Sequence, residues 1–290
     1  MSPRPSPGSE YILTLTCPDR PGLVHAVTGY LLDFTANILA SQQFDDRLTG
    51  RFFMRVHFVI QGPPVTVEEL RTSFDSVART YAMDFNVVDV ATPTRTLIMV
   101  SKFGHCLNDL LFRTQVGTLN IDIAAIVSNH PDFATLAATY GIPFHHIPVT
   151  ADTKPAAEDK LLQLVADERV DLVVLARYMQ VLSPLASRAL SGRAINIHHS
   201  FLPSFKGAKP YHQAHERGVK LIGATAHYIN DDLDEGPIIE QDVVRVDHYL
   251  DPDELVAAGR DVETQVLARA VKWHCEQRVL PNGQRTVVFR

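Results

Sequence analysis

The chain has 290 residues, which is more than one domain of ordinary size holds, so two domains are expected. Hydrophobic residues make up 46% of it and charged residues 21%, values that are typical of globular proteins and exclude a mainly disordered chain. The 27 basic and 33 acidic residues give a net charge of -6, and this acidic balance argues against nucleic acid as a partner.

The three cysteines, Cys17, Cys106 and Cys275, are far apart and form no Cys-x-x-Cys arrangement. Their number and spacing argue against a disulfide framework and against a thiolate metal site. No stretch approaches the roughly 18 consecutive apolar residues of a membrane span, and residues 1–9 lack the apolar core of a signal peptide. We therefore expect a cytoplasmic protein with no membrane partner.

The first part of the chain, residues 8–90, alternates between strand and helix patterns. A period of two residues indicates strands, and a period near 3.6 residues indicates amphipathic helices. The expected elements are a strand at 11–16, a helix at 23–34, strands at 37–45 and 51–60, a helix at 66–81 and a strand at 84–90. The order βαββαβ predicts a ferredoxin-like domain.

A polar, proline-bearing stretch at 91–96 predicts a linker, and a second domain is expected over 97–290. Apolar strands separated by helices indicate a Rossmann-like α/β domain with a mostly parallel sheet covered on both faces. The expected strands are at 97–101, 121–128, 144–147, 171–176, 194–197, 223–229 and 237–244, followed by a helix at 251–274 and a hairpin turn at 281–283.

Histidines gather in the second domain. Two of the 13 histidines fall within residues 1–90, whereas five lie between His198 and His227. In an open parallel sheet the ligand crevice lies beyond the carboxyl ends of the strands, and the strand at 194–197 leads into several polar residues there. Asn196 and His198 are two positions apart on this extended segment, so their side chains point to the same side.

A second polar cluster, residues 230–237, lies between two apolar strands. By spacing alone it fits a solvated acidic turn, just as His198 and His199 fit a hydrogen-bonded pair in the core. An Asn-x-His segment followed, one structural unit later, by a carboxylate loop with a glycine suits a site that polarises a carbonyl and moves a proton.

Two other kinds of site compete for these residues. A metal site would use His212 and His215, but the sequence has no His-Glu-x-x-His and a third ligand would have to come from elsewhere. Ser200 as an acyl nucleophile lacks the Gly-x-Ser-x-Gly turn. We expect no metal, and we expect His212 and His215 to pack a helix near the pocket mouth.

Several segments resemble the folate-dependent formyltransferases. They are Asn196-Ile-His198, Ser200-Phe-Leu-Pro-Ser-Phe-Lys-Gly207 and Asp232-Leu-Asp-Glu-Gly-Pro-Ile-Ile239. Within that group the chain is most similar to the formyltetrahydrofolate deformylases, through residues 101–111, 210–213, 218–228 and 234–242. The turn Pro18-Asp-Arg-Pro-Gly22 resembles an ACT domain, which these deformylases carry at the N-terminus, so the resemblance covers nearly the whole chain.

The resemblance implies that Asn196, His198 and Asp234 are the catalytic residues. Asn196 would donate to the oxygen that becomes anionic, and a neighbouring Asp234 would favour the charged form of His198. His227 would support them, or would simply pack in its strand. The residues expected to contact the folate are Met179, Gln180, Val181, Leu182, Asn230, Asp231, Asp232 and Leu233, although the apolar ones among them also suit a core.

The implied reaction is hydrolysis of 10-formyltetrahydrofolate to formate and tetrahydrofolate, with no cofactor. Transfer to a phosphorylated amine such as glycinamide ribonucleotide would need an anion-binding loop at a helix N-terminus. Residues 101–108 have one glycine in that place, which favours water, although Lys102 could still meet a phosphate. A non-catalytic regulator that senses folate is the other alternative. The use of the formate, for purine synthesis or for balancing the folate pool, stays open.

The N-terminal domain has two interpretations. Its turn at a helix N-terminus could bind the carboxylate of an amino-acid effector, with Asp19, Arg20, Gly22 and Asn37 as the expected contacts. Alternatively the domain serves only to form a homo-oligomer, for which a dimer of dimers is favoured.

Overall fold

The computed structural model describes residues 8–200 and 210–290, which divide into two compact units. The first unit comprises the chain up to Pro93 together with residues 276–280 and 287–290. The second comprises Thr94–Cys275 and Pro281–Thr286. The predicted fold class, with a βαββαβ domain followed by an α/β domain, is confirmed.

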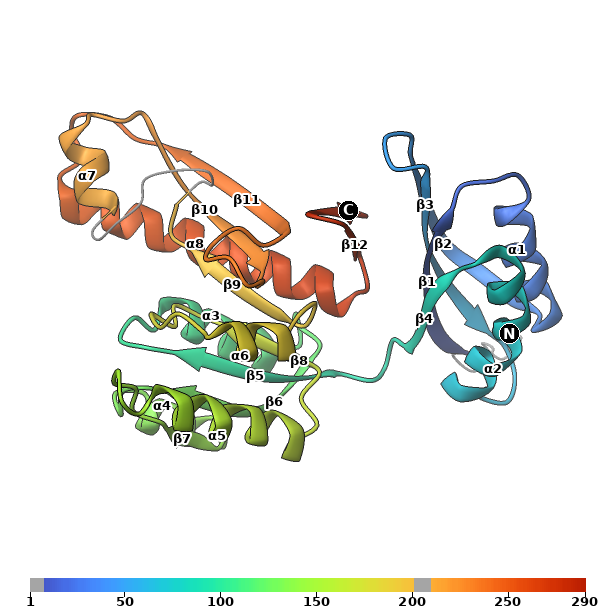
Figure 1. Ribbon diagram of the computed structural model, residues 1–290, viewed down its shortest axis with the longest axis horizontal. Helices are drawn as coiled ribbons and strands as arrows, with labels where there is room; N and C mark the ends of the chain where they lie inside the picture. The colour runs from blue at the N-terminus through green and yellow to red at the C-terminus, as the bar shows by residue number, and fades with distance from the viewer. Residues whose placement is uncertain (1–7, 201–209) are drawn as a thin grey trace, which may run out of the picture. The chain divides into compact units, whose positions relative to one another are not determined.

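The first unit is an antiparallel sheet with two helices (Figure 1). Its strand order is β2-β3-β1-β4. The elements are β1 (Ser9–Pro18), α1 (Leu23–Asp33), β2 (Ala36–Asp46), β3 (Arg51–Ile60), α2 (Val67–Tyr81) and β4 (Asp84–Asp89).

Local sequence signals account for the helix starts in this unit. The Thr66 hydroxyl accepts from the backbone N–H of Glu69, and the Glu69 carboxylate accepts from Thr66, so a capping box opens α2. Gly22 precedes α1 with φ of 96°, a left-handed conformation that suits glycine. Both helices bury one apolar face against the sheet, with Phe74 between the rings of Tyr30 and Phe85.

The end of the chain departs from the predicted domain bounds. Leu280 and Phe289 form a small apolar cluster with Phe53 of β3, so residues 276–280 and 287–290 pack with the first unit. Arg55 supports this arrangement by donating to the backbone oxygen of Glu276. The second domain was expected to run to residue 290, and local periodicity could not show that these few apolar side chains pair with a distant strand.

The second unit contains most of the remaining elements. They are β5 (Thr94–Val100), α3 (His105–Gln115), β6 (Ile121–Ser128), α4 (Ala134–Thr139), β7 (Phe144–His146), α5 (Lys154–Asp167), β8 (Leu172–Leu175), α6 (Pro184–Ala189), β9 (Ala194–His198), α7 (Pro210–Glu216), β10 (Leu221–Tyr228), β11 (Ile238–Arg245) and α8 (Pro252–Cys275). The closing hairpin of β12 (Val279–Asn282) and β13 (Arg285–Val288) is present with its turn at Gly283. Because β5 begins at Thr94, it takes up half of the linker expected at 91–96.

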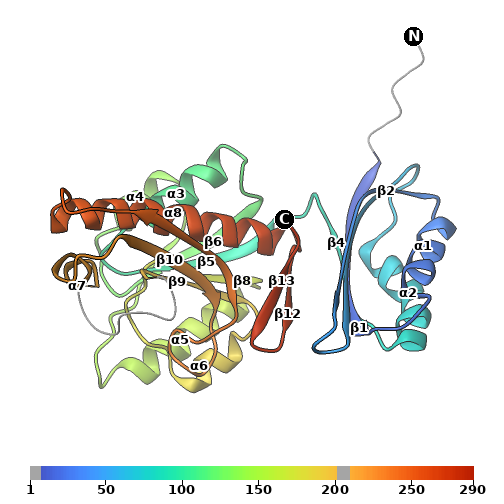
Figure 2. The same cartoon turned by 90° about the horizontal axis from the view of Figure 1, so that it is seen from above.

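The central sheet has the order β11-β10-β9-β8-β5-β6-β7, in which β5 to β9 are parallel and β10 is antiparallel to both neighbours. Figure 2 shows α3, α4 and α8 on one face and α5 and α6 on the other. The chain runs outward from β5 to β7 and then returns to β8 on the opposite side of β5. The crevice between the ends of β5 and β8 is therefore the topological switch point, where ligands bind in such sheets.

Among residues 8–200 and 210–290, no helix is both long enough and apolar enough to cross a membrane.

Truncation of the core of the first unit should be costly. Phe74 is 0% exposed, so Phe74→Ala should lower the free energy of unfolding by about 3–5 kcal/mol, through lost burial and the cavity left behind. Urea denaturation of the full chain would measure this. Leu32→Ala, at a side chain that is 72% exposed on α1, is the control and should change stability by less than about 0.5 kcal/mol. Equal effects of the two substitutions would contradict the assigned core.

Candidate active site

A cavity of about 760 Å³ opens at the carboxyl ends of β8 and β9, which is a volume typical of small-ligand sites. Its walls come from the segment after β8, the end of β9, the end of β10 and the loop before β11. Its lining residues include Arg177, Met179, Gln180, Val181, Leu182, Asn196, His198, His199, His227, Asn230, Asp231, Asp232, Leu233, Asp234 and Gln284.

Strand pairing places the polar side chains of β9 and β10 side by side. Asn196 pairs with His227 and His198 with Thr225 in the antiparallel ladder. As the alternation predicted, Asn196 and His198 both line the cavity. The intervening Ile197 is buried, although it also borders the cavity.

The loop after β10 brings a carboxylate to these two residues. Asp234 adopts a left-handed conformation with φ of 57°, which aspartate tolerates better than most residues and which is common at functional sites. Gly236 lets the loop fold back, since a Cβ at that position would lie 1.7 Å from the carbonyl oxygen of Tyr228. The Tyr228 N–H also donates to the oxygen of Pro237 at 2.9 Å.

The three predicted catalytic residues meet in the structure. Asp234 Oδ2 lies 3.1 Å from His198 Nδ1, and Asn196 Nδ2 donates to Asp234 Oδ1 at 3.4 Å. Burial acts to raise the pKa of Asp234, but the contacts with His198 and His227 outweigh it and hold this pKa well below its usual range. Asp234 is therefore a carboxylate at neutral pH, and its side chain is 24% exposed toward the cavity.

His227 lies directly behind this group. Its Nδ1 is 2.8 Å from the carbonyl oxygen of Tyr228, so Nδ1 carries the proton that is donated there. Its Nε2 lies 3.3 Å from Asn196 Nδ2 and 3.7 Å from Asp234 Oδ1. A neutral His227 accepts from the amide of Asn196 and thereby determines which end of that amide faces the cavity.

The imidazole of His199 is stacked on that of His198, with ring centroids 5.0 Å apart. Burial, reinforced by the positive charge of Arg177, lowers the pKa of His199 to about 4. His199 is thus neutral at physiological pH. Its neighbour His198 is the imidazole in contact with a carboxylate.

The segment expected to hold the pterin ring forms one wall of the cavity. Met179 and Val181 are exposed on that wall, and Gln180 and Leu182 are partly buried. The segment is tied to the end of β5, because the Met179 N–H donates to the Ser101 hydroxyl at 3.0 Å.

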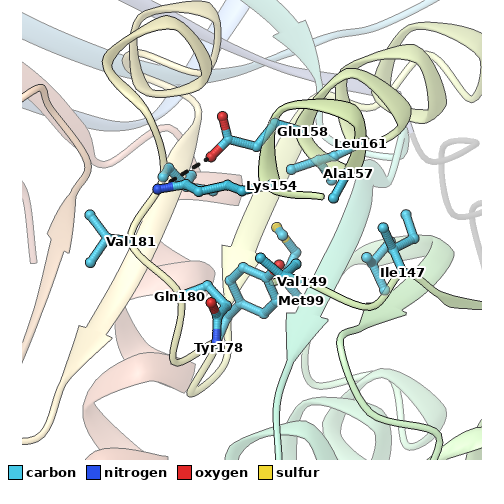
Figure 3. A pocket seen from close by; sticks show the side chains of 12 residues that line it. Met99, Ile147, Val149, Lys154, Ala157, Glu158, Leu161, Tyr178, Gln180 and Val181 are labelled. Atoms are coloured by element: carbon cyan, nitrogen blue, oxygen red, sulfur yellow. Dashed lines mark ion pairs between the residues drawn. The ribbon is translucent and has the colours of Figure 1, made fainter. Parts of the chain in front are cut away.

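Figure 3 shows the other side of this segment, where Tyr178 and Gln180 face Met99 and Val149 around a pocket of only about 10 Å³. Lys154 pairs with Glu158 there, and Glu158 accepts from the Ser183 N–H at 2.8 Å. The segment that forms this wall of the cavity is therefore packed on its far side and hydrogen-bonded near each end.

The acidic loop residues Asn230, Asp231, Asp232 and Leu233 also line the cavity. Asn230 accepts from the Asp232 N–H and donates to the oxygen of Glu235, so it shapes the loop. Asp231 pairs with Arg188 on α6 at 3.3 Å. The expected role of these four residues in folate contact remains a prediction.

In the first unit the expected effector residues Asp19, Arg20, Gly22 and Asn37 are all exposed. Arg20 lies over the ring of Tyr81, 4.5 Å from its centroid, and the Asp19 N–H donates to the oxygen of Gly50. An effector site at these residues remains a prediction.

Three residues around the cavity were missed from the sequence. Arg177 is buried, has a left-handed φ of 64° and lies two residues after the end of the apolar strand β8. A charged residue so close to a buried strand was the available signal. Glu263 of α8 forms an ion pair with Arg177. It follows Leu255 and Gly259 at intervals of four residues, so it belongs to the buried face of this helix. Gln284 reaches the cavity from the C-terminal hairpin, and no local pattern indicates that.

Among the described residues, one group of three could supply metal ligands: His105, Cys106 and Glu263, whose ligand atoms lie within 4.8 Å of one another. Two observations disfavour a cation there. Arg177 Nε already lies 3.3 Å from Glu263 Oε2, and burial raises the pKa of the Cys106 thiol, which keeps it protonated. The expectation of no metal remains a prediction.

Two other expectations concern the segment around α7. His212 and His215 do lie on this short helix, the latter exposed to solvent. The motif residues 201–207, which contributed to the family resemblance, lie outside the described part of the chain.

Comparison with known proteins places both units in known families. A family model described as formyl transferase matches residues 94–271, and an ACT domain model matches residues 11–75. Formyltetrahydrofolate deformylase of Corynebacterium sp. (strain P-1) is 56% identical over 280 residues, which are 97% of this chain and 98% of that protein.

Solved structures give the same result over the full length. A formyltetrahydrofolate deformylase from Burkholderia mallei has a TM-score of 0.93 at 56% identity, covering 97% of this chain and 100% of that one. The corresponding enzyme from Pseudomonas syringae pv. tomato has a TM-score of 0.94 at 44% identity, covering 98% and 95%.

The state of Asp234 predicts a pH-dependent stability difference. Because its pKa is lowered in the folded protein, the ionised carboxylate stabilises the fold above the unfolded pKa of about 4. This contribution is lost as the pH falls toward the lower, folded value. In urea denaturation, the difference in unfolding free energy between wild type and Asp234→Asn should shrink as the pH falls below about 4. A difference that stays constant down to about pH 3 would contradict the assignment.

Proposed function

Since the chain belongs to the formyltetrahydrofolate deformylase family, we propose that it hydrolyses 10-formyltetrahydrofolate to formate and tetrahydrofolate. The observation that carries this proposal is the convergence of Asn196, His198 and Asp234 at one end of a cavity large enough for a folate ring system. An amide donor, an imidazole and a carboxylate within hydrogen-bond reach of one another form a set suited to amide hydrolysis without a covalent intermediate.

The substrate bond is easier to attack than a peptide bond. The formyl nitrogen N10 shares its lone pair with an aryl ring, so the carbonyl is less stabilised by resonance. Water adds to the formyl carbon, the carbonyl oxygen becomes anionic, and the C–N10 bond then breaks as N10 takes a proton. The net change consumes one water and yields formate and the N10–H of tetrahydrofolate.

Asn196 is placed to stabilise the anionic oxygen. Its Nδ2 lies 3.3 Å from His227 Nε2 and 3.4 Å from Asp234 Oδ1, and the residue lines the cavity, where the substrate oxygen would accept from the same amide. An oxyanion contact of this kind is typically worth ~3–4 kcal/mol in the transition state. Because His227 holds the amide orientation, the donor is preorganised before the substrate binds.

His198 and Asp234 divide the proton transfers. A carboxylate with a lowered pKa is a weak base, so Asp234 chiefly stabilises the imidazolium of His198 and orients the attacking water. The proton from water passes to this pair, and His198 delivers a proton to departing N10. The neutral His199 behind the ring avoids a second positive charge that would compete for Asp234.

Water is favoured as the acceptor over an amine because the turn that opens α3 lacks a glycine-rich anion-binding loop: residues 101–108 contain one glycine. His105, the first residue of α3, lies 2.8 Å from the buried carboxylate of Glu263, and Cys106 and Leu107 are buried beside it. A phosphorylated amine would need this position for its anion. Formyl transfer to glycinamide ribonucleotide is thus not favoured, and the assembled catalytic set argues against a non-catalytic regulator.

We further propose that no cofactor takes part, since the aryl amide needs no Lewis acid for attack by water. A reducing, cytoplasmic setting agrees with three free cysteines, two of which are buried. The ACT domain supports an amino-acid effector at Asp19, Arg20, Gly22 and Asn37. It also supports a homo-oligomer, with a dimer of dimers favoured, because β2 is an edge strand that exposes Ile38, Leu39 and Phe44.

The purified full chain should release one formate for each tetrahydrofolate formed from 10-formyltetrahydrofolate, in buffer without any amine. Formate and tetrahydrofolate are measured separately, and the assay is repeated after dialysis against a metal chelator. Because water is the acceptor and no metal is needed, both assays should give the same rate. Turnover that depends on glycinamide ribonucleotide would identify a transformylase, and loss of activity on chelation would overturn the cofactor-free proposal.

Replacement of the catalytic residues should remove turnover while leaving folate binding in place. Asn196→Ala should lower kcat by about 10²–10³-fold, and His198→Ala and Asp234→Ala by at least about 10²-fold each. Calorimetry with tetrahydrofolate measures binding, which should persist because the walls of the cavity are unchanged. His215→Gln, at an exposed position on α7, is the control and should keep wild-type rates. Substantial activity in His198→Ala or Asp234→Ala would refute the proposed mechanism.

A further inference from the structure

Tyr228, the last residue of β10, has its side chain on the far side of the sheet from the active-site cavity. Successive strand residues point to opposite faces, so His227 lines the cavity and Tyr228 faces α8, which packs along β10 (Figure 1). The Tyr228 hydroxyl lies 2.7 Å from Nδ1 of His274, in the last turn of α8. Tyr228 is 4% exposed. Its side chain is thus held by α8, and the hydrolytic mechanism makes no use of this pair.

Both members of the Tyr228–His274 pair are uncharged at physiological pH. Burial lowers the pKa of His274 to about 4, against the opposing effect of the Asp171 charge. Burial also raises the pKa of the Tyr228 phenol above its usual value. The hydrogen bond therefore joins a phenol and a neutral imidazole, and neither partner changes charge in the neutral pH range.

The backbone of Tyr228 organises the catalytic group. Its carbonyl oxygen lies 2.8 Å from His227 Nδ1 and accepts the proton of that nitrogen. His227 Nε2 lies 3.3 Å from the Asn196 amide. Gly236 also passes close to the same carbonyl. A displacement of this carbonyl would therefore change the orientation of His227 and, with it, the amide that stabilises the anionic oxygen.

The ladder between β10 and β11 is irregular at this point. Its register shifts between Ala226 and His227, and a shift of this kind interrupts the ladder and re-aims the side chains beside it. On the other side, Tyr228 is the last residue that pairs with β9, opposite Ile195. The contact with α8 therefore adds a constraint at a place where strand pairing ends on one side and is irregular on the other.

We propose that Tyr228 is a positioning residue for the reaction: its hydroxyl, held by His274, fixes the backbone carbonyl that orients His227 and, through His227, the Asn196 amide. The inference rests on the proposed hydrolytic function, in which Asn196 stabilises the anionic oxygen. Neither Tyr228 nor His274 is among the described residues that line the cavity, so they act only through these neighbours.

Removal of the hydroxyl should lower the rate without weakening substrate binding. Tyr228→Phe keeps the ring and loses the hydrogen bond, so kcat for formate release should fall about tenfold while KM stays within about twofold. The matched control is Tyr30→Phe, which removes a buried hydroxyl that donates to the oxygen of Leu70 at 2.8 Å in the first unit. It should lower the thermal stability to a similar extent and leave kcat unchanged.

Variants of the partner test the hydrogen bond from the other end. His274→Leu removes the partner atom and should reproduce the loss of kcat, whereas His274→Asn places an amide near the position of Nδ1 and should keep at least about half of the wild-type value. The double variant Tyr228→Phe with His274→Leu should be no slower than the slower single variant, because both remove the same interaction.

A further pair of variants tests whether the effect runs through His227. In a His227→Ala background, Tyr228→Phe should lower kcat by less than about twofold more, because the imidazole that the carbonyl orients is gone. An equally large loss in that background, or wild-type kcat in Tyr228→Phe, would overturn the inference.

The exchange of the His227 Nδ1 proton with solvent gives a readout that does not depend on turnover. Its resonance in the proton NMR spectrum of the full chain is identified by its loss in His227→Ala. The proton should exchange at least about tenfold faster in Tyr228→Phe than in wild type, and at the wild-type rate in Tyr30→Phe. Unchanged exchange in Tyr228→Phe would overturn the inference, whereas absence of formate release by wild type would refute the hydrolytic proposal instead.

Discussion

The catalytic geometry depends on one close approach between two stretches of backbone. Gly236 passes so near the carbonyl of Tyr228 that any side chain at that position would collide with it. This contact folds the loop back on the end of β10 and places Asp234, in its left-handed conformation, beside the end of β9. The same carbonyl accepts from His227 Nδ1, so a single peptide group both closes the loop and orients the imidazole that supports Asn196.

Two carboxylates in the second unit are kept ionised by contacts with histidine, but they lie in different surroundings. Asp234 and Glu263 each contact a histidine, and each has a lowered pKa despite burial. The partners of Asp234 face a cavity, where a substrate and a water can reach them. The partners of Glu263 come from α3, α7 and the end of β8 and enclose it completely. One carboxylate is therefore available for chemistry, and the other is a buried partner that links α3, α7 and the segment after β8.

Much of the fold could be predicted because its elements carry strong local patterns. The strand at 51–60 and the strand at 121–128 have the predicted bounds, since each is a mainly apolar segment bounded by turns. Predictions were less accurate where contacts between residues far apart in the sequence determine the structure. The polar residues 94–96 form a strand because they pair with β6 and β8, and the C-terminal residues join the first unit through Phe53.

For the site, the order of residues is enough to indicate which groups are available and which of them share a face. The two-residue period of a strand predicts that Asn196 and His198 point together, and the glycine after the acidic cluster marks a tight loop. The folded chain was needed to show that Asp234 reaches His198, that His227 lies behind Asn196, and that Arg177 and Glu263 form a buried pair. The physical reason is that local patterns depend on neighbours within one turn or strand, whereas these contacts depend on the order of strands in the sheet and on the packing of α8 against it.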